Sequence, residues 1–205
     1  LYRHGKRVVL HYNIGGITVL ESPWAGGVGD KLYLSRTIEV APSSKTLSNL
    51  IASNPNSTSE QLNFNTAKIV SESKELWVRV IGQGVSLKTI NNRVNLNISP
   101  GNKKRLAKVL YSNSKELLTQ IVNNTSIDSP SKYTNGGPGI WTPLATNGII
   151  GKTRDSFAID TIRLPFDNPW NALFFTSGHD FLADKSALIA TVHGDIWRVT
   201  GIDET

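Results

Sequence analysis

Apolar and polar residues alternate in short runs through the first 124 residues, which is typical of β-strands with one buried face. Between Arg7 and Glu21 two such runs flank Gly15-Gly16. This pair predicts a β-hairpin, because glycine readily adopts the positive φ of a tight turn. Pro23 should end the second strand, since proline has no N–H for the ladder. Further strands are predicted at 31–40, 76–81, 85–90, 94–98 and 106–111, with Asn91-Asn92 as a turn pair between the strands 85–90 and 94–98.

A single helix is predicted from Ser114 to Val122. Ser114 can accept hydrogen bonds from the free N–H groups of the first turn, and Glu116 lies near the positive end of the helix dipole. Apolar residues recur at helical spacing along one face, namely Leu117, Leu118, Ile121 and Val122. Two polar stretches, 25–30 and 41–66, are expected to be loops, the second with a short helical turn at 47–51.

Together these elements indicate a mainly β fold. We expect residues 1–124 to form an antiparallel β-sandwich-like domain with the helix packed on it. Its inner face should consist of Leu10, Tyr12, Leu34, Val78, Val80, Leu96 and Ile98. Residues 125–152 are punctuated by proline and by the run Gly136-Gly137-Pro138-Gly139, a composition typical of a connector between domains.

The alternation resumes in residues 153–205, where tight polar turns separate apolar runs. A hairpin of 175–182 with 188–192, followed by a strand at 196–199, is the pattern of a β-propeller blade. A propeller needs about four to eight blades, and no repeat of fixed period is visible. We therefore predict the first strands of an incomplete β-propeller. The chain contains no Met, and we expect it to be a piece of a longer protein.

Composition mainly excludes classes of function. Apolar residues make up 39% of the chain and charged residues 19%, as in ordinary globular proteins, and no apolar run reaches the ~20 residues of a membrane span. The net charge of +6 is scattered apart from Lys103-Lys104-Arg105, so no nucleic-acid partner is expected. That run is interpreted as a solvated loop, with phosphate contact as the alternative. Cysteine is absent, which excludes disulfides, thiolate metal sites, a cysteine nucleophile and covalent haem attachment within these residues.

Two His/Asp pairs stand out near the C-terminus, His179-Asp180 and His193-Gly194-Asp195. Two imidazoles and two carboxylates could hold a metal ion, or a histidine oriented by a carboxylate could act as a base. The alternative is structural, because an aspartate after a glycine commonly accepts backbone N–H bonds and shapes a turn. No catalytic residue is assigned.

Tryptophans provide the other candidate chemistry. Trp141 and Trp170, together with Trp197, could stack on a sugar ring, since a flat aromatic face packs against a pyranose. The alternative is that tryptophans beside Pro143 and Pro169 anchor loops on a core. Trp24 lies in a glycine-rich stretch and is a better candidate for an exposed sugar contact.

From Tyr133 onward, the chain reads TNGGPGIW, then NGIIGKTRDSFAIDTIRLPFDNPW, then SGHDFLADKSALIATVHGDIWRVTGIDE. This order of glycine, proline and aromatic residues resembles a family of large secreted bacterial proteins. In that family an uncharacterised β-rich domain precedes a propeller similar to the quinoprotein glucose/sorbosone dehydrogenases, and a c-type cytochrome domain often follows. The opening GKRVVLHYNIGGITVLESP also resembles the family's upstream domain. The matching positions are Gly136, Gly137, Pro138, Trp141, Gly148, Gly151, Asp160, Thr161, Leu164, Pro165, Asn168, Pro169, Trp170, Asp180, Phe181, Ala190, Thr191, Gly194, Asp195, Trp197, Gly201, Ile202 and Asp203.

The resemblance implies a periplasmic or extracellular protein whose partners are propeller and cytochrome domains of the same protein. It places pyrroloquinoline quinone (PQQ) and haem c in domains beyond Thr205, because the family's cytochrome motif needs cysteines. We expect a non-catalytic accessory region of an oxidoreductase-like protein that binds carbohydrate or organises neighbouring domains. One alternative is part of a quinone-dependent sugar dehydrogenase propeller, with His179 or His193 near its site. The other is a structural protein-interaction domain.

Overall fold

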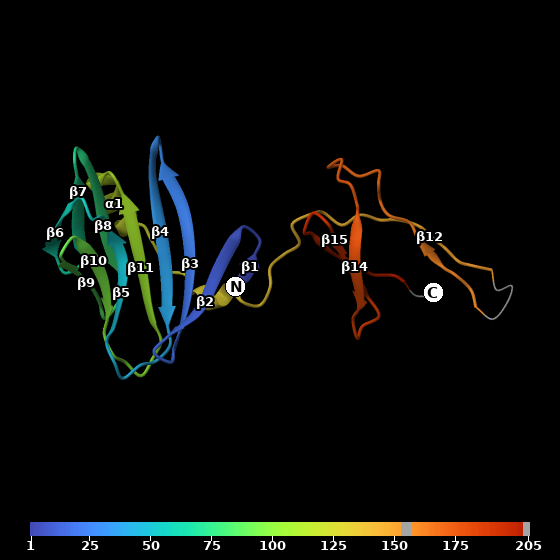
Figure 1. Cartoon of the computed structure of the whole chain (residues 1–205), viewed down its shortest axis with the longest axis horizontal. Coiled ribbons are helices and arrows are strands. Elements are labelled where there is room, and N and C mark those ends of the chain that lie inside the picture. Colours follow the sequence, from blue (N-terminus) through green and yellow to red (C-terminus); the bar gives the residue numbers. More distant parts are fainter. Residues whose placement is uncertain (153–156, 203–205) are drawn as a thin grey trace. The chain divides into compact units, whose positions relative to one another are not determined.

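The computed structural model describes residues 1–152 and 157–202. It divides into two compact units, Leu1–Ile140 (the N-terminal unit) and Trp141–Thr205 (the C-terminal unit). The division falls inside the stretch 125–152, where the sequence predicts a connector. Both units are built from antiparallel strands (Figure 1), and the prediction of a mainly β fold with one α-helix is confirmed for the described residues.

An eight-stranded antiparallel sheet forms one layer of the N-terminal unit. Its two-residue turn at Gly15-Gly16 has φ of 56° and 85°, which confirms the predicted hairpin. In spatial order the strands are β1 (Tyr2–His4), β2 (Arg7–Ile14), β3 (Ile17–Val28), β4 (Lys31–Val40), β11 (Arg105–Ser112), β8 (Lys74–Ile81), β7 (Thr66–Ser71) and β6 (Thr58–Asn63).

A three-stranded sheet forms the second layer, in the order β5 (Leu47–Ser53), β10 (Arg93–Ile98) and β9 (Val85–Ile90). Asn91 and Asn92 both have positive φ and close the β9–β10 hairpin, as their turn chemistry predicts. The β5–β10 register shifts between Val94 and Asn95, so β5 carries a bulge.

The two sheets share one hydrophobic core. The large sheet contributes alternate residues of its central strands, and the small sheet contributes nearly every inward position of its three strands. Because strand side chains alternate between faces, one apolar row per strand fills the space between the layers. The most deeply buried members include Val19, Ile38, Val78, Leu87, Val94, Leu96 and Val109.

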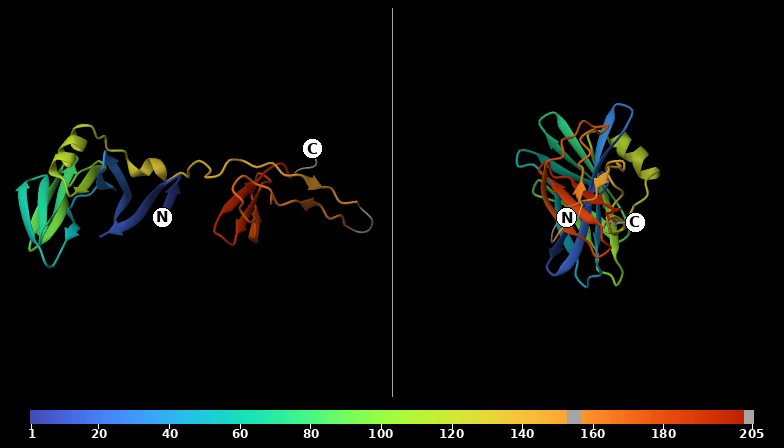
Figure 2. Two further views of the ribbon diagram at one scale, coloured as in Figure 1. Left: turned by 90° about the horizontal axis from the view of Figure 1, so that it is seen from above. Right: turned by 90° about the vertical axis from the view of Figure 1, so that its right-hand side faces the viewer.

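The α-helix α1 (Lys115–Asn123) covers the outer face of the large sheet against β8 and β11 (Figure 2). Its amino-terminal cap is as predicted, because Ser114 Oγ accepts the Leu117 N–H at 3.3 Å. The apolar stripe of α1 packs on Trp77 and Leu110, which point outward from their strands. The prediction of one packed helix is therefore confirmed down to its first capping residue.

Residues 124–134, called the strap below, lead from α1 across the outer face of the same sheet. The strap contains a short 3-10 helix, η1 (Pro130–Tyr133), which contacts β1 to β4 and buries Pro130. Because η1 covers this area, β4 is buried on both faces at its end, with Ile38 and Val40 inside and Thr37 and Glu39 under the strap.

Pro23 does not end its strand, contrary to the sequence prediction. The strand β3 continues to Val28, and Pro23 pairs with Arg36 of β4. The pairing of β2 with β3 stops at Glu21, so the missing N–H of Pro23 faces a side where no ladder bond is required. The predicted loop 25–30 is therefore wrong as far as Val28. Gly26 belongs to the strand and leaves room for the Tyr33 ring, which would lie 2.5 Å from a Cβ there.

The predicted loop 41–66 with a helical turn at 47–51 is also wrong. This stretch supplies β5 and β6, because Leu47 and Ile51 both face the core of the sandwich at strand spacing. Leu10 and Leu34 do not belong to the core, again contrary to prediction, and Tyr12 is only partly buried. Leu34 is 60% exposed because the three-stranded sheet is too narrow to cover the whole inner face of the larger one.

The C-terminal unit contains a three-stranded antiparallel sheet of β14 (Thr176–Phe181), β15 (Ala187–Thr191) and β16 (Ile196–Val199). The strands follow the order that the sequence predicts. A separate two-stranded ribbon joins β12 (Gly148–Ile149) to β13 (Thr161–Ile162). The described residues contain no sheet that closes into a ring, so the incomplete propeller remains a prediction.

Replacing Ser114 by Ala should destabilise the N-terminal unit by about 1 kcal/mol, because the first turn of α1 loses the acceptor for the Leu117 N–H. Urea denaturation followed by circular dichroism measures the change. Ser73→Ala serves as the control, since Ser73 is exposed in the β7–β8 turn, and it should shift the free energy of unfolding by less than about 0.5 kcal/mol. Equal effects of the two substitutions would contradict the capping role.

Candidate functional site

A hollow in the C-terminal unit gathers most of the aromatic and acidic residues that the sequence singles out. Its volume is about 340 Å³. Trp141 precedes the β12–β13 ribbon, Trp170 lies before β14, and Trp197 lies on β16, so the tertiary fold brings three distant stretches together. The complete lining is Trp141, Trp170, Asn171, Ala172, Leu173, Phe174, Thr191, His193, Asp195 and Trp197.

The aromatic rings form a continuous chain along this hollow. Trp141 and Trp170 have ring centroids 5.1 Å apart with an interplanar angle of 50°, and Trp170 and Trp197 are 6.1 Å apart at 39°. Phe174 completes the chain 5.0 Å from Trp197 and is itself buried. These separations lie in the range at which tilted aromatic pairs attract one another. The rings are tilted relative to one another, so they do not form a flat aromatic surface.

The side chain of Asn168 holds the loop that carries Trp170. Its amide N–H₂ donates to the carbonyl oxygens of Pro165, Phe166 and Ala172, and its side-chain oxygen accepts the N–H groups of Trp170 and Ala172. The Asn168 side chain is buried and its hydrogen-bonding groups are fully used, so this loop is held by one residue. The sequence signal is the Asn-Pro pair, which favours turns, but it gives no indication of the side-chain network.

Asp195 closes the turn between β15 and β16. Its N–H donates to Thr191 Oγ1 at 3.2 Å, and its carbonyl accepts the Thr191 N–H at 2.9 Å. Gly194, at φ 93°, supplies the backbone conformation of this turn. The Asp195 carboxylate accepts the Trp141 indole N–H through Oδ1 at 3.4 Å. The turn is thus held by backbone groups of Asp195, and its side chain does not accept the backbone N–H bonds that the structural interpretation expected. The carboxylate instead reaches the hollow.

The His/Asp residues proposed as ligands are only partly brought together. His193 and Asp195 line the hollow, but His179 and Asp180 lie on β14, where His179 pairs with Ile189 and its ring contacts Phe181. His193 lies outside the strands, in the turn between β15 and β16. In the described part of the chain, no group of three His, Asp or Glu side chains is arranged to hold a metal ion.

Trp24 lies apart from these tryptophans, in the N-terminal unit. The Arg7 guanidinium carbon sits 4.4 Å above its ring and 5.2 Å from the Tyr133 ring, so Arg7 is held between two aromatic faces. Trp24 is 39% exposed and borders a larger open cleft of about 1030 Å³. Part of Trp24 is therefore open for the predicted contact, although its ring also makes a cation–π contact with Arg7.

A partly buried ion pair between β3 and β4 lies at the edge of that larger cleft, which Arg36 helps to line. Arg36 donates to Glu21 through Nε at 2.6 Å and through Nη2 at 3.0 Å, and Tyr12 Oη donates to the same carboxylate at 2.8 Å. Burial opposes ionisation of Glu21, but these hydrogen bonds outweigh it and hold the pKa of the carboxyl below its usual value. Burial also raises the pKa of Tyr111, whose hydroxyl donates to the Ile51 carbonyl across the two sheets.

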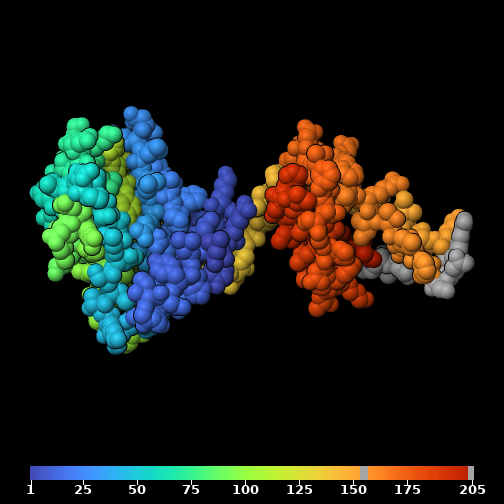
Figure 3. All heavy atoms as spheres, viewed as in Figure 1, coloured from blue at the N-terminus to red at the C-terminus, as the bar shows by residue number. Residues whose placement is uncertain are grey.

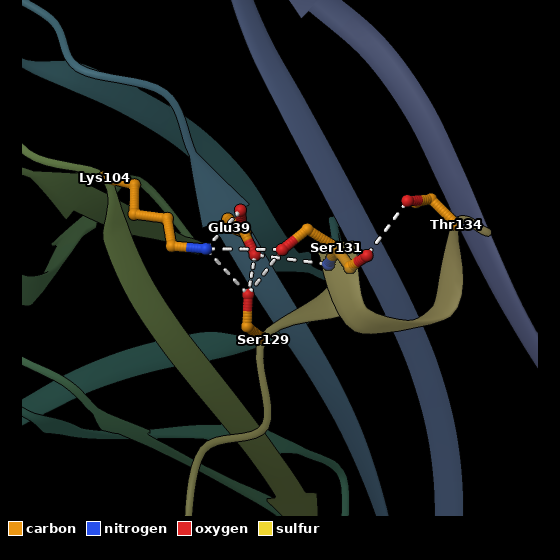
Figure 4. A network of polar contacts seen from close by, with 5 residues as sticks. All are labelled: Glu39, Lys104, Ser129, Ser131 and Thr134. Carbon is orange, nitrogen blue, oxygen red and sulfur yellow. Dashed lines mark hydrogen bonds and ion pairs between the residues drawn. The ribbon is translucent and has the colours of Figure 1, made fainter.

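The basic run 103–105 is structural at two of its three positions. Lys104 Nζ donates to Glu39 at 3.1 Å and to Ser129 Oγ at 3.1 Å, which ties the strap to the sheet (Figure 4). Arg105 donates to the Pro100 carbonyl at 3.1 Å. These contacts differ from the expected solvated loop, because two of the charged groups are engaged with the fold.

Glu39 is the centre of that network. Its carboxylate accepts hydrogen bonds from Ser129 Oγ, Lys104 Nζ and the Ser131 N–H. Burial alone would raise the pKa of Glu39, but the hydrogen bonds from the three donors lower it by more. The net pKa of the carboxyl therefore lies below its usual value. The ionised form of Glu39 therefore stabilises the docked strap.

Comparison with protein-family models, with curated protein sequences and with solved structures found no match to this chain. No helix in the described ranges 1–152 and 157–202 has the length and apolar character needed to cross a membrane.

Glu39→Gln should destabilise the N-terminal unit by about 1–2 kcal/mol at pH 7, since the charged acceptor of three hydrogen bonds is lost. The carboxyl has a lowered pKa when folded, so its contribution is full above the unfolded value of about 4.3 and disappears as pH falls through the folded pKa. The stability difference between the wild type and Glu39→Gln should therefore shrink below about pH 4.

Urea denaturation between pH 3 and pH 7 measures this difference. Lys132→Ala removes an exposed ion pair with Asp128 in the same strap and is the matched control, with an expected change below about 0.5 kcal/mol. A stability difference for Glu39→Gln that stays constant down to pH 3 would show that the charge of Glu39 does not hold the strap.

Proposed function

We propose that this chain is a non-catalytic accessory region of a secreted, oxidoreductase-like protein of several domains. In this proposal the C-terminal unit organises the protein by docking its β14–β16 sheet against a neighbouring β-sheet of propeller type. The single observation that carries it is the exposure of that sheet. Every residue of β14 is exposed, and large apolar side chains lie open at Leu173, Phe175, Phe181, Val192 and Ile196.

The C-terminal unit exposes more large apolar side chains than it buries. Among its described residues only Phe174 and Ala187 are buried apolar side chains, whereas Phe181 is 64% exposed and Ile196 is 71% exposed. The atoms of this unit are drawn in orange to red in the space-filling view (Figure 3). Large exposed apolar patches mark interaction sites, so these exposed side chains support a docking surface. Burying each of these side chains would contribute about 1.5–3 kcal/mol.

A propeller blade has these properties, because each blade packs its faces against the blades beside it. The order of strands in β14–β16 and the resemblance of residues 133–204 to the secreted family support the same assignment. The location that goes with it is the periplasm or the cell exterior. Any PQQ or haem c chemistry would belong to other domains of that protein.

The alternatives receive less support. His179 and His193 form no side-chain hydrogen bond with another described residue, so the hydrogen bonding offers no support for a histidine at a quinone site. A structural domain that binds another protein would use the same exposed sheet, and differs from the proposal only in the partner. Carbohydrate binding is favoured by a different feature, the tryptophan hollow.

Hydrogen exchange of the complete product of the gene, compared with the chain of 205 residues, tests the docking. The amides of β14–β16 should exchange about 10- to 100-fold more slowly in the complete product, since burial of one large side chain stabilises by 1.5–3 kcal/mol and each 1.4 kcal/mol is a factor of ten. The amides of the N-terminal core should exchange equally in both.

Phe181→Ser should abolish this extra protection in the complete product. Leu32→Ser is the matched control, because Leu32 is also a largely exposed apolar residue, in the N-terminal unit, and it should have no effect on β14–β16. Equal exchange of β14–β16 in the two proteins, or equal effects of the two substitutions, would reject the docking function. Protection that depends on an unrelated protein would favour the interaction-domain alternative.

A further inference from the structure

We propose that Trp141, Trp170 and Trp197, together with Asp195, form a binding site for a neutral pyranose sugar of one or two rings. The proposal rests on side chains other than those of the docking surface, so either can fail without the other. It names a ligand for the accessory region proposed above, and it specifies neutral sugars as the class of carbohydrate.

The aromatic wall supplies the apolar half of such a site. A pyranose has a face of C–H groups that packs on an indole ring, while its hydroxyl groups lie around its edge. Trp141 is 40% exposed, and its indole N–H is already bound to Asp195, so the open area of this side chain is available for an apolar contact. Phe174 is buried, its ring lies 5.0 Å from that of Trp197, and it packs the loop instead.

The shape of the wall limits the size and form of the ligand. Successive rings are tilted by 50° and 39°, so they do not form the flat platform that an extended crystalline surface requires. The hollow of about 340 Å³ lies at the lower end of the ~300–1,000 Å³ range of ligand pockets. A chain end or a short soluble sugar fits these limits.

Asp195 supplies the polar half and the charge selection. Its Oδ1 holds Trp141 in place, and its Oδ2 makes no hydrogen bond within the described ranges, so it is an acceptor for a sugar hydroxyl. Its backbone is fixed by Thr191, which makes the carboxylate a pre-positioned group. A carboxylate on the ligand would be repelled by Asp195, and the site therefore favours neutral sugars over uronic acids.

Titration of the indole N–H signals of the 205-residue chain, by NMR of ¹⁵N-labelled protein, tests the site. Glucose, cellobiose, N-acetylglucosamine and galacturonate are the probes. Saturable shifts of the Trp141, Trp170 and Trp197 signals are expected with at least one neutral sugar and none with galacturonate. Trp141→Ala should weaken that binding at least tenfold, and Asp195→Asn should weaken it and remove the discrimination against galacturonate.

Trp24→Ala is the matched control, because Trp24 has nearly the same exposure, 39% against 40%, in the other unit. It should leave the titration unchanged. The proposal is overturned if no neutral sugar shifts the three indole signals at concentrations up to 50-fold above the dissociation constant of ~1 mM expected of a weak site. It is also overturned if Trp24→Ala weakens sugar binding as much as Trp141→Ala does. Tighter binding of galacturonate than of glucose would overturn the assignment to neutral sugars.

Discussion

The hydrophobic core between the eight-stranded and three-stranded sheets is the interaction on which the N-terminal unit depends. Val19, Ile38, Val94 and Leu96 are buried almost completely, and they come from three strands and both sheets. Since apolar burial is the dominant favourable term in folding, this shared core sets the sheet pairings and the register of every central strand. The cleft beside Trp24 exists because the smaller sheet leaves part of the inner face of the larger one uncovered.

Polar groups then determine how the peripheral segments lie on that core. Glu39 is on the outer face of β4, where an unpaired carboxylate would be costly to bury, and the strap supplies Ser129 and Ser131 as its hydrogen-bond donors. Glu21 and Arg36 satisfy each other on the inner face, at the edge of the cleft. Such pairs specify one arrangement more than they add stability, because their desolvation offsets much of the attraction between the charges.

The C-terminal unit depends on a different balance. Among its described residues only two apolar side chains, Phe174 and Ala187, are buried, and the aromatic chain and the hydrogen bonds of Asn168 add contacts that hold its loops. The same shortage of core leaves aromatic faces open at the hollow and apolar side chains open on the strands. A unit built in this way has both surfaces available for binding.

Local chemistry in the sequence was sufficient for the features that involve neighbouring residues. Gly15-Gly16 and Asn91-Asn92 predict their turns, Ser114 predicts the start of α1, and strict alternation predicts β4, β9 and β10, because each signal depends on backbone conformation within a few residues. The tertiary structure alone decided the rest. Pro23 continues a strand because of where β2 stops pairing, and Leu47 and Ile51 form a strand because β10 lies beside them. Trp141, Trp170, Trp197 and Asp195 meet only through the folding of three separate segments, and contacts between distant residues leave no periodic signal in a single sequence.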